Sequence, residues 1–367
     1  MEKLSARDGA MSLEIIDDRS IWDSFVDNNP DKLLFFKWDF LKIIEKHSGY
    51  TLLLYGIFDE RNNNILGLLP LFFINKMGLR FLFSQPPRSG VPYIGLLINP
   101  EYYSLRQRQK ERYLNDIVEQ ITKKIEELSP NYIYLSFGPH LQDMRPFQWN
   151  NFDIGVHYTY IIDLTLPLDT IWNSFDKNCR NKIRSGEKHN LFLKETNDTK
   201  TLCSKIEDRY RQQGLNFPFF GSDYLDDIVT SFPQNVTIVS VCKDENIIDF
   251  AANYAYNDRI VLWMGGIVTE KTIHSNEYAI GEFIKKAKSE GLKILEIQGA
   301  DTQRLCSFKT KFNPGIEASF SVKKKDIIGR ISEFLYLNYI RRVWILFIVI
   351  LQYFFMDASL LYSCSAC

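Results

Sequence analysis

The stretch that decides the fold runs from Trp263 to Pro314. It opens with Trp263-Met264-Gly265-Gly266, passes through a turn, a helix and a strand, and closes with Gln298-Gly299-Ala300-Asp301 and Phe308-Lys309. Apolar residues in its middle recur at positions i, i+3, i+4 and i+7: Ile280, Phe283, Ile284 and Ala287. This spacing predicts a helix with one buried face.

A short strand, Leu292–Ile297, is predicted directly after this helix. Ser275 or Asn276 is expected to cap the start of the helix with its side chain, and Gly291 to follow its last turn. Strand–helix–strand runs are right-handed crossovers in nearly all sheets. The polar residues after the second strand therefore lie at the carboxyl edge of the sheet, where open α/β sheets bind ligands.

The first half of the chain has the same order of elements. A helix ending at Leu128 and a strand at Tyr132–Phe137 match the helix and strand just described, and a hairpin at Leu52–Phe73 matches one at Val236–Trp263. An internal repeat of this size indicates two copies of one α/β unit. We predict an α/β (α+β) fold with two tandem domains, each a mixed twisted sheet flanked by helices.

The predicted domain boundaries follow from the repeat and from a change in composition. The first domain is expected at residues 1–150 and the second at 151–325, with the polar stretch Gln142–Asn151 as the linker. Residues 326–367 are expected to form a C-terminal apolar tail that contains a helix.

Within this tail, the run Val343–Met356 is apolar except for Gln352 and follows several cations. The run has 14 residues, and a helix needs about 20 to span a bilayer. We favour a helix lying in the membrane surface, with a helix packed on the protein and a spanning anchor as alternatives. Because no apolar signal segment opens the chain, we expect a cytoplasmic protein, peripheral on the inner face of the cell membrane if this helix binds there.

Composition excludes some classes of protein. The chain has 367 residues, 45% of them hydrophobic and 24% charged, with a formal net charge of -1. A net charge near zero argues against broad electrostatic binding to DNA. It does not exclude a local basic groove that binds tRNA. The six cysteines are scattered and predict reduced thiols, and no metal-ligand cluster is expected.

A basic helix is predicted at Asn178–His189. Its cations Arg180, Arg184 and Lys188 recur every fourth residue, which places them on one face. Two interpretations stay open at this point: a solvated helix face, or a surface that binds an anion.

Several motifs carry a family resemblance. Ile171-Trp172-Asn173-Ser174-Phe175, followed by Arg180 and by Ile183-Arg184, resembles the arginine-rich signature of the FemAB-like branch of the GNAT N-acyltransferase superfamily. Gly299-Ala300 followed by Phe308-Lys309 is also similar, and so is Lys37-Trp38 upstream. The resemblance covers roughly residues 12–324. It implies two tandem GNAT-like domains that transfer an acyl or aminoacyl group to an amine, from acyl-CoA or aminoacyl-tRNA, often in building cell-wall or surface polymers.

The resemblance also implies residue roles. Phe308 and Lys309 would line the transfer site, and Arg184, with Arg180 beside it, would contact an anionic substrate. The chain departs from ordinary CoA-dependent GNAT enzymes in one respect, because the Gln/Arg-x-x-Gly-x-Gly/Ala loop before the helix is replaced by residues 272–276. The donor therefore stays open, with acyl-CoA (acetyl-CoA) preferred over aminoacyl-tRNA.

Acyl transfer needs a deprotonated amine and stabilisation of the developing oxyanion. We predict four catalytic residues: Lys309, Phe308, Glu296 and Asp301. Lys309 would stabilise the oxyanion, or else be a surface lysine, and Glu296 or Asp301 would accept the amine proton, or else have a packing or capping role. We predict five substrate-binding residues: Arg180, Arg184, Tyr278, Asn276 and Gln298. Tyr278 could equally be a core residue, and no Ser-His-Asp set is evident.

The function predicted from these features is transfer of an acyl group, preferably acetyl, from acyl-CoA to an amine of a cell-surface or polysaccharide-type precursor. One alternative is an aminoacyltransferase that uses aminoacyl-tRNA. The other is a non-catalytic module that binds a glycan or lipid precursor. The acceptor expected of the enzyme is a small molecule or a glycan precursor.

Overall fold

The structure, a computed structural model, describes residues 11–336 except 213, 215, 216, 218, 245 and 266–273. The first unit and the connection after it contain these elements: β1 (Met11–Ile15), α1 (Arg19–Asp27), η1 (Leu34–Phe36), α2 (Trp38–Ser48), β2 (Thr51–Asp59), β3 (Ile65–Lys76), β4 (Leu79–Phe83), β5 (Leu97–Ile98), α3 (Glu101–Ser104), α4 (Gln107–Leu128), β6 (Tyr132–Phe137), α5 (Arg145–Trp149) and β7 (Asp153–Asp163).

The remaining elements follow in the same manner: α6 (Leu168–Ser174), α7 (Lys177–Lys188), β8 (Leu191–Thr196), α8 (Thr199–Gln212), α9 (Ser222–Ser231), β9 (Val236–Lys243), β10 (Asn246–Tyr256), β11 (Arg259–Gly265), α10 (Ser275–Ser289), β12 (Ile294–Ile297), α11 (Gln303–Lys309), η2 (Thr310–Phe312), β13 (Gly315–Lys325) and α12 (Ile327–Leu335). All strands in the described part of the chain belong to one 13-stranded sheet.

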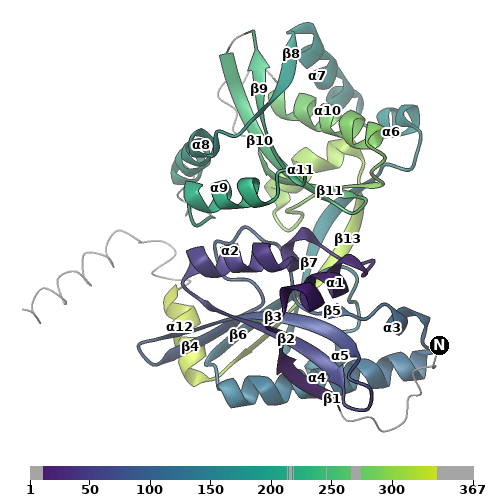
Figure 1. Cartoon of the computed structure of the whole chain (residues 1–367). Helices are drawn as coiled ribbons and strands as arrows, with labels where there is room; N and C mark the ends of the chain where they lie inside the picture. The colour runs from purple at the N-terminus through teal and green to yellow at the C-terminus, as the bar shows by residue number, and fades with distance from the viewer. Residues whose placement is uncertain are drawn as a thin grey trace, which may run out of the picture.

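The predicted repeat is confirmed by strand pairing. In the first unit β1, β2, β3 and β4 pair antiparallel in sequence, and β4 then pairs parallel with β6 across α4. In the second unit β8, β9, β10 and β11 do the same, and β11 pairs parallel with β12 across α10. Both crossovers are therefore strand–helix–strand units, and they lie in the lower and upper halves of Figure 1.

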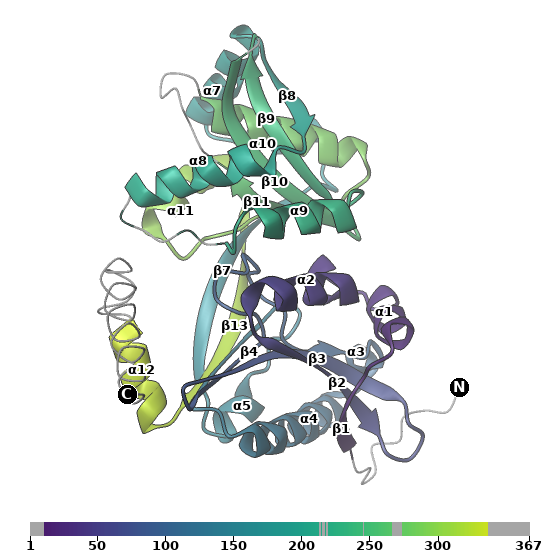
Figure 2. The ribbon, with the colours of Figure 1, turned by 60° about the vertical axis from the view of Figure 1, so that its left-hand side comes forward.

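The strand after each crossover passes to the other unit. β7 follows β6 in sequence but pairs with β12, and β13 follows β12 but pairs with β6. The two strands also pair with each other over nine residues of register, from Gly315↔Ile161 to Lys323↔Asp153, and Figure 2 shows them side by side between the two halves. The boundaries at 150 and 325 stay a prediction, but a cut at 150 would separate β6 from its partner β13.

The predicted linker, Gln142–Asn151, is part of the first core. It contains α5, where Phe147 is fully buried and its ring centroid lies 5.1 Å from that of Phe137. The polar residues around Phe147 suggested a loop, but one large aromatic side chain is enough to anchor this segment to the sheet.

Helices η1 and α2 are separate, because Lys37 between them has extended backbone angles of φ -63° and ψ 138°. Two local predictions need correction. The expected hairpin at Val236–Trp263 is three strands. At the start of α10 the N-cap residue His274 makes no side-chain cap bond, and Ser275, which was expected to cap the helix, donates its hydroxyl hydrogen to Asp249 Oδ2 at 2.8 Å instead.

A hydrophobic core joins the two units. It contains fully buried side chains of α1, η1 and α2 and buried side chains of α8, α9 and β10, among them Trp22, Phe35, Leu202, Tyr224 and Tyr254. Helices α2 and α9 contact each other across it (Figure 1), where Nε2 of His47 lies 2.5 Å from Oδ2 of Asp227. The relative position of the two units is therefore fixed by apolar burial as well as by the sheet.

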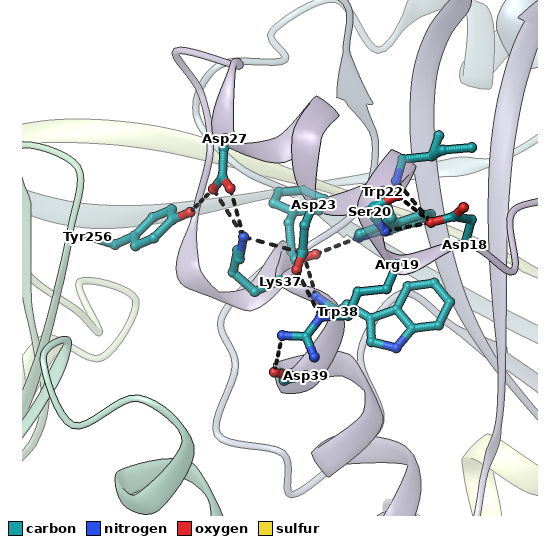
Figure 3. Close-up of polar contacts among 12 residues, drawn as sticks. Asp18, Arg19, Ser20, Trp22, Asp23, Asp27, Lys37, Trp38, Asp39 and Tyr256 are labelled. Carbon is teal, nitrogen blue, oxygen red and sulfur yellow. Dashed lines mark hydrogen bonds and ion pairs between the residues drawn. The ribbon is translucent and has the colours of Figure 1, made fainter.

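A polar cluster between α1, α2 and β10 adds a second link (Figure 3). Tyr256 on β10 donates its hydroxyl hydrogen to Asp27 at 2.9 Å. Lys37 Nζ lies 3.0 Å from Asp27 and 3.4 Å from Asp23, and Asp23 accepts the backbone N–H of Trp38 at 3.0 Å. The carboxylate of Asp27 thus holds one residue from each unit.

The C-terminal part of the described chain is the helix α12, which Asp326 caps by accepting the Gly329 N–H at 2.7 Å. Of the helices within residues 11–336 that the structure describes, none combines the length and apolar character needed to cross a bilayer. The run Val343–Met356 and the helix predicted there lie outside the described residues.

Candidate active site

A cavity opens where the parallel pair of the second unit separates. β11 and β12 are paired over only four residues, from Arg259↔Ile294 to Leu262↔Ile297. Beyond that point β11 continues to Gly265 beside β10, whereas the chain after β12 turns away at Gly299, whose φ of +84° favours glycine. The resulting cavity has a volume of about 870 Å³ and lies at the carboxyl ends of the strands, as the sequence predicted.

Both units contribute side chains to the walls of this cavity. The first unit and the exchanged strands supply Pro92, Tyr93, Tyr134, Ser136, His157, Tyr158, Thr159 and Ser319. The second unit supplies residues of α8, β11, α10 and β12 and of the segment after β12, including Arg209, Trp263, Asn276, Glu296, Gln298, Asp301, Arg304, Phe308 and Lys309. The cavity is therefore a joint product of the two repeats.

The equivalent gap in the first unit is filled by its own chain. After β4 and β6 separate, Ser84 Oγ accepts the Ser136 N–H at 2.9 Å and Ile94 forms a bridge to Phe137. The loop between Ser84 and Ile94 then reaches the second unit, where Trp263 Nε1 donates to the Gly90 carbonyl at 2.7 Å. This loop is therefore a connection between the two units.

Lys309 ends α11 beside the cavity and is 9% exposed. Its Nζ donates to the carbonyl oxygens of Gln298 and Gly299, the latter at 3.1 Å. Burial lowers the pKa of Lys309 to about 8, because a low-dielectric environment disfavours the ammonium form. The neighbouring Phe308 also lines the cavity, with its ring centroid 6.1 Å from that of Phe312.

Glu296 is fully buried at the cavity wall and accepts several hydrogen bonds. Arg259 Nη1 lies 2.6 Å from its Oε2, Thr159 Oγ1 donates to Oε1 at 2.9 Å, and the Tyr93 hydroxyl lies 3.1 Å from Oε2. Burial and the Glu296 carboxylate together hold the pKa of Tyr93 well above its ordinary value. With these donors in place, Glu296 is better placed to fix the position of Arg259 and Tyr93 than to accept a substrate proton.

Asp301 is exposed and holds two groups of β7. Its Oδ1 accepts the Tyr158 N–H at 2.8 Å, and its Oδ2 lies 3.3 Å from Nδ1 of His157. On the other side of the imidazole, Nε2 lies 2.9 Å from Oγ of Ser321. Because these three residues come from β7, β13 and the loop after β12, sequence spacing gave no signal for a Ser–His–Asp arrangement.

Three other predicted residues are divided between the cavity and the core. Asn276 and Gln298 line the cavity, and Nε2 of Gln298 is buried without a hydrogen-bond partner in the part of the chain described. Tyr278 is buried and donates its hydroxyl hydrogen to the Leu191 carbonyl at 2.6 Å. The core interpretation of Tyr278 therefore agrees with the structure.

The two arginines expected to bind the substrate, Arg180 and Arg184, do not lie at the cavity with Lys309. Arg180 donates to the carbonyl oxygens of Asn173, at 3.0 Å, and of Phe175. The Arg184 guanidinium is exposed and stacks 5.3 Å from the ring centroid of Trp172. Neither arginine is among the described residues that line the cavity, whereas Lys309 is.

Two cations at the cavity, Arg209 and Arg304, had no signal in the sequence. Arg209 lies on α8 and donates to the Gly265 carbonyl at 3.1 Å. No group of three or more His, Cys, Asp or Glu side chains that could hold a metal ion occurs within the residues that the structure describes.

Comparison with known families identifies this half of the chain. Residues 173–309 match the family model described as an acetyltransferase (GNAT) domain. The chain contains a GNAT acyltransferase domain. Its match begins in α6 and ends at Lys309, so it includes the separated strands and most of the cavity wall. No curated protein matches the chain.

Solved structures share the fold of both units, at low sequence identity. The crystal structure of FemX superposes with a TM-score of 0.63 at 12% identity, covering 84% of this chain and 96% of that one. L-PGS from Bacillus licheniformis gives 0.52 at 12% identity, covering 89% and 98%. A C-terminal domain named as belonging to a lysylphosphatidylglycerol synthetase, from Agrobacterium fabrum, gives 0.50 at 11% identity, covering 80% and 90%. The GNAT fold predicted from the motifs is confirmed.

Proposed function

We propose that this protein transfers an acyl or aminoacyl group to an amine of a cell-envelope precursor, in the cavity beside Lys309. The observation that carries the proposal is the position of Lys309 at the opening between β11 and β12. A protonated lysine has three N–H donors, and two carbonyls engage Nζ here. The remaining hydrogen is available for the oxyanion that forms when the amine attacks the donor carbonyl.

For the donor, an aminoacyl ester on tRNA now has more support than acyl-CoA. The sequence before α10 lacks the glycine pattern that binds CoA pyrophosphate in ordinary GNAT enzymes, and the fold resembles FemX and a domain named for lysylphosphatidylglycerol synthesis. Acetyl-CoA stays the second candidate, because the family model for residues 173–309 is described as an acetyltransferase. Arg209 and Arg304 at the cavity would contact the phosphates of either donor.

The site of action in the cell is also part of the proposal. Five apolar side chains of α12 are 46% to 76% exposed: Ile327, Ile328, Ile331, Phe334 and Leu335. In the sequence, α12 is followed by the apolar run Val343–Met356. A cytoplasmic protein that rests on the lipid surface through α12 would bury this face and meet an envelope precursor there.

A transfer assay tests the function. The purified chain is incubated with ¹⁴C-labelled acetyl-CoA or ¹⁴C-aminoacyl-tRNA, together with an amine-bearing peptidoglycan precursor or phosphatidylglycerol vesicles. We expect label to appear in one acceptor and to disappear with Lys309→Met, while the surface variant Lys293→Met, which is far more exposed and pairs with Asp258, stays active. Binding of a precursor without transfer of label from either donor would instead support the non-catalytic module.

A further inference from the structure

One part of the cavity wall, between α8 and β11, is apolar. Four of its side chains are buried in the hydrophobic core that joins the two units, and two more pack partly buried against that core. These six side chains, which we call the α8 pocket, all line the cavity: Ile206, Phe219, Ala252, Met264, Tyr210 and Trp263. None of the six is charged, and they offer both aliphatic and aromatic surface to a ligand.

The first unit forms one end of the α8 pocket. Trp263 Nε1 donates to the Gly90 carbonyl at 2.7 Å, and the ring centroids of Trp263 and Phe219 lie 5.8 Å apart with the ring planes at 89°. Arg88 Nη2 donates to the Phe219 carbonyl at 2.8 Å, and a Cβ added at Gly90 would lie 2.1 Å from the Phe219 ring. The two aromatic rings are thus held against the loop that contains Arg88 and Gly90.

The charged groups of the cavity lie beside the α8 pocket and not among its six side chains. Arg209 on α8 donates to the carbonyl of Gly265, the exposed last residue of β11, at 3.1 Å. The carboxylate of Glu296 is already paired with Arg259 at 2.6 Å. A charged group placed inside the pocket would therefore lose its hydration without gaining an ion partner from the pocket side chains.

The position of Lys309 indicates which part of the donor would reach the pocket. Its Nζ contacts the carbonyl oxygens of Gln298 and Gly299, at the point where β11 and β12 separate. The reacting carbonyl of the donor therefore belongs at this opening. The carrier, a tRNA or CoA, is large and has to extend into solvent, whereas a pocket that ends at a loop suits the group on the other side of the carbonyl.

A different wall of the cavity suits the acceptor. The exchanged strands and β6 contribute four hydroxyl side chains to it: Tyr134, Ser136, Thr159 and Ser319. Hydroxyl groups can both donate and accept hydrogen bonds, so this wall matches a polar acceptor better than an apolar acyl chain. The α8 pocket is thus left for the group that is transferred.

We propose that the α8 pocket receives the acyl chain or amino-acid side chain of the donor and selects an uncharged, apolar one. This inference rests on the proposed function and names the class of group transferred. An aliphatic or aromatic group gains free energy on leaving water for this pocket, whereas a lysine or glutamate side chain does not. The first unit takes part in the selection, because its loop holds Phe219 and Trp263 in place.

Binding of stable donor analogues tests this selection without turnover. One series is 3′-amino-3′-deoxyadenosine carrying leucine, lysine or glutamate through an amide bond, and the other is S-hexyl-CoA and its ω-carboxylated analogue. Isothermal titration calorimetry with the full chain gives each Kd. In the series that binds, we expect the apolar member to bind at least about tenfold more tightly than the charged members.

Two variants at one position then introduce opposite charges. Tyr210 is half-buried in the pocket wall, so Tyr210→Glu should reduce the preference for leucyl over lysyl analogue by about tenfold, because the ammonium gains an ion partner. Tyr210→Lys should do the same for the glutamyl or carboxylated analogue. The matched control is Phe192→Glu, which places a carboxylate at an aromatic side chain that is 44% exposed on β8. Its Kd ratios should equal those of wild type.

Equal affinity of wild type for apolar and charged analogues overturns the proposal, and so does failure of every analogue to bind. Unchanged Kd ratios in both folded Tyr210 variants overturn the placement of the selected group beside Tyr210. If the analogues bind with the expected preference but neither labelled donor supports transfer, the proposed function fails and the ligand class of the α8 pocket stands. The wild-type comparison decides the selection even where a Tyr210 variant has a much lower Tm.

Discussion

The hydroxyl of Tyr93 lies 3.1 Å from Oε2 of Glu296, and the two residues come from different repeats. Tyr93 belongs to the loop that fills the gap in the first unit, whereas Glu296 is the third residue of β12. The loop that fills the gap between β4 and β6 therefore contacts a residue in the wall of the cavity between β11 and β12. This explains why, in the described part of the chain, the gap between β4 and β6 is filled whereas the gap between β11 and β12 opens into a cavity.

Removing the cation that faces Glu296 should destabilise the protein. Arg259→Met leaves a fully buried carboxylate without its ion-pair partner, which typically costs about 3–5 kcal/mol. The double variant Arg259→Met/Glu296→Gln should recover much of this loss, because the charge is removed together with its partner. Urea denaturation of the four proteins of this cycle measures the coupling, and additive effects would contradict a direct pair.

Lys309→Met should abolish turnover and keep the fold stable. The pKa of Lys309 is lowered by burial to about 8 from 10.5. The unfolded chain therefore binds more protons than the folded one between these values, so the free energy of unfolding of wild type should rise as pH increases through this window. Lys309→Met should lack that rise. Parallel stability curves for the two proteins from pH 8 to 10 would exclude a lysine with a lowered pKa.

Turnover should fall as pH increases, whereas the free energy of unfolding should rise. If the protonated Lys309 stabilises the oxyanion, activity falls as pH increases through about 8, since the ammonium group loses its proton there. Initial rates with the active donor at saturating concentration, between pH 6.5 and 9.5, provide the measurement. A rate that keeps rising above pH 9 would remove the electrostatic role assigned to Lys309.

Gly90→Ala should loosen the contact between the loop and the second unit. Gly90 has a φ of +68°, and an added Cβ would collide with the Phe219 ring. Gly49→Ala is a matched control, because Gly49 has a φ of +73° and nothing within 4 Å of an added Cβ. We expect the control to lose about 1 kcal/mol from backbone strain alone and Gly90→Ala to lose clearly more in thermal denaturation. Equal losses would mean that the loop adapts without strain.

Charge on α12 should weaken binding to lipid. Ile328→Glu/Ile331→Glu replaces two side chains that are 49% and 56% exposed, so the fold should tolerate it. We expect less protein to float with vesicles containing anionic lipids, whereas Ile247→Glu, at an exposed site on β10, should float like wild type. Equal flotation of all three proteins would remove α12 from the membrane proposal.

The spacing of residues close together in the sequence predicted the helices and strands that depend on neighbouring residues alone. The crossover from β11 through α10 to β12 was predicted because its apolar period and Gly291 lie within 40 residues of chain. The position of the basic helix was also predicted correctly, but its arginines do not lie at the cavity with Lys309. The buried face of α7 is set by Cys179, Ile183 and Gly186, and Gly186 packs against the Tyr278 side chain. Arg180 and Arg184 lie one position further along the helix and so face away from that contact.

Long-range pairing could not be predicted from the sequence. A strand such as β13 has the same alternating pattern whether it joins its own unit or the other one, because the pattern reports burial and not the partner. The contacts of His157 depend on this exchange, since Ser321 and Asp301 are 164 and 144 positions away from it in sequence. Only the arrangement of strands brings them together.

The strand exchange also has a consequence for synthesis on the ribosome. One edge of β6, which is complete at Phe137, pairs with β4, and the opposite edge pairs with β13, which ends at Lys325. At the usual 5–20 residues per second, the roughly 190 residues in between take about 10–40 seconds to make. During that time the nascent first unit presents an open edge strand, the kind of surface to which other chains add. Chaperone occupancy during translation is therefore expected to persist until residue 325 has left the exit tunnel.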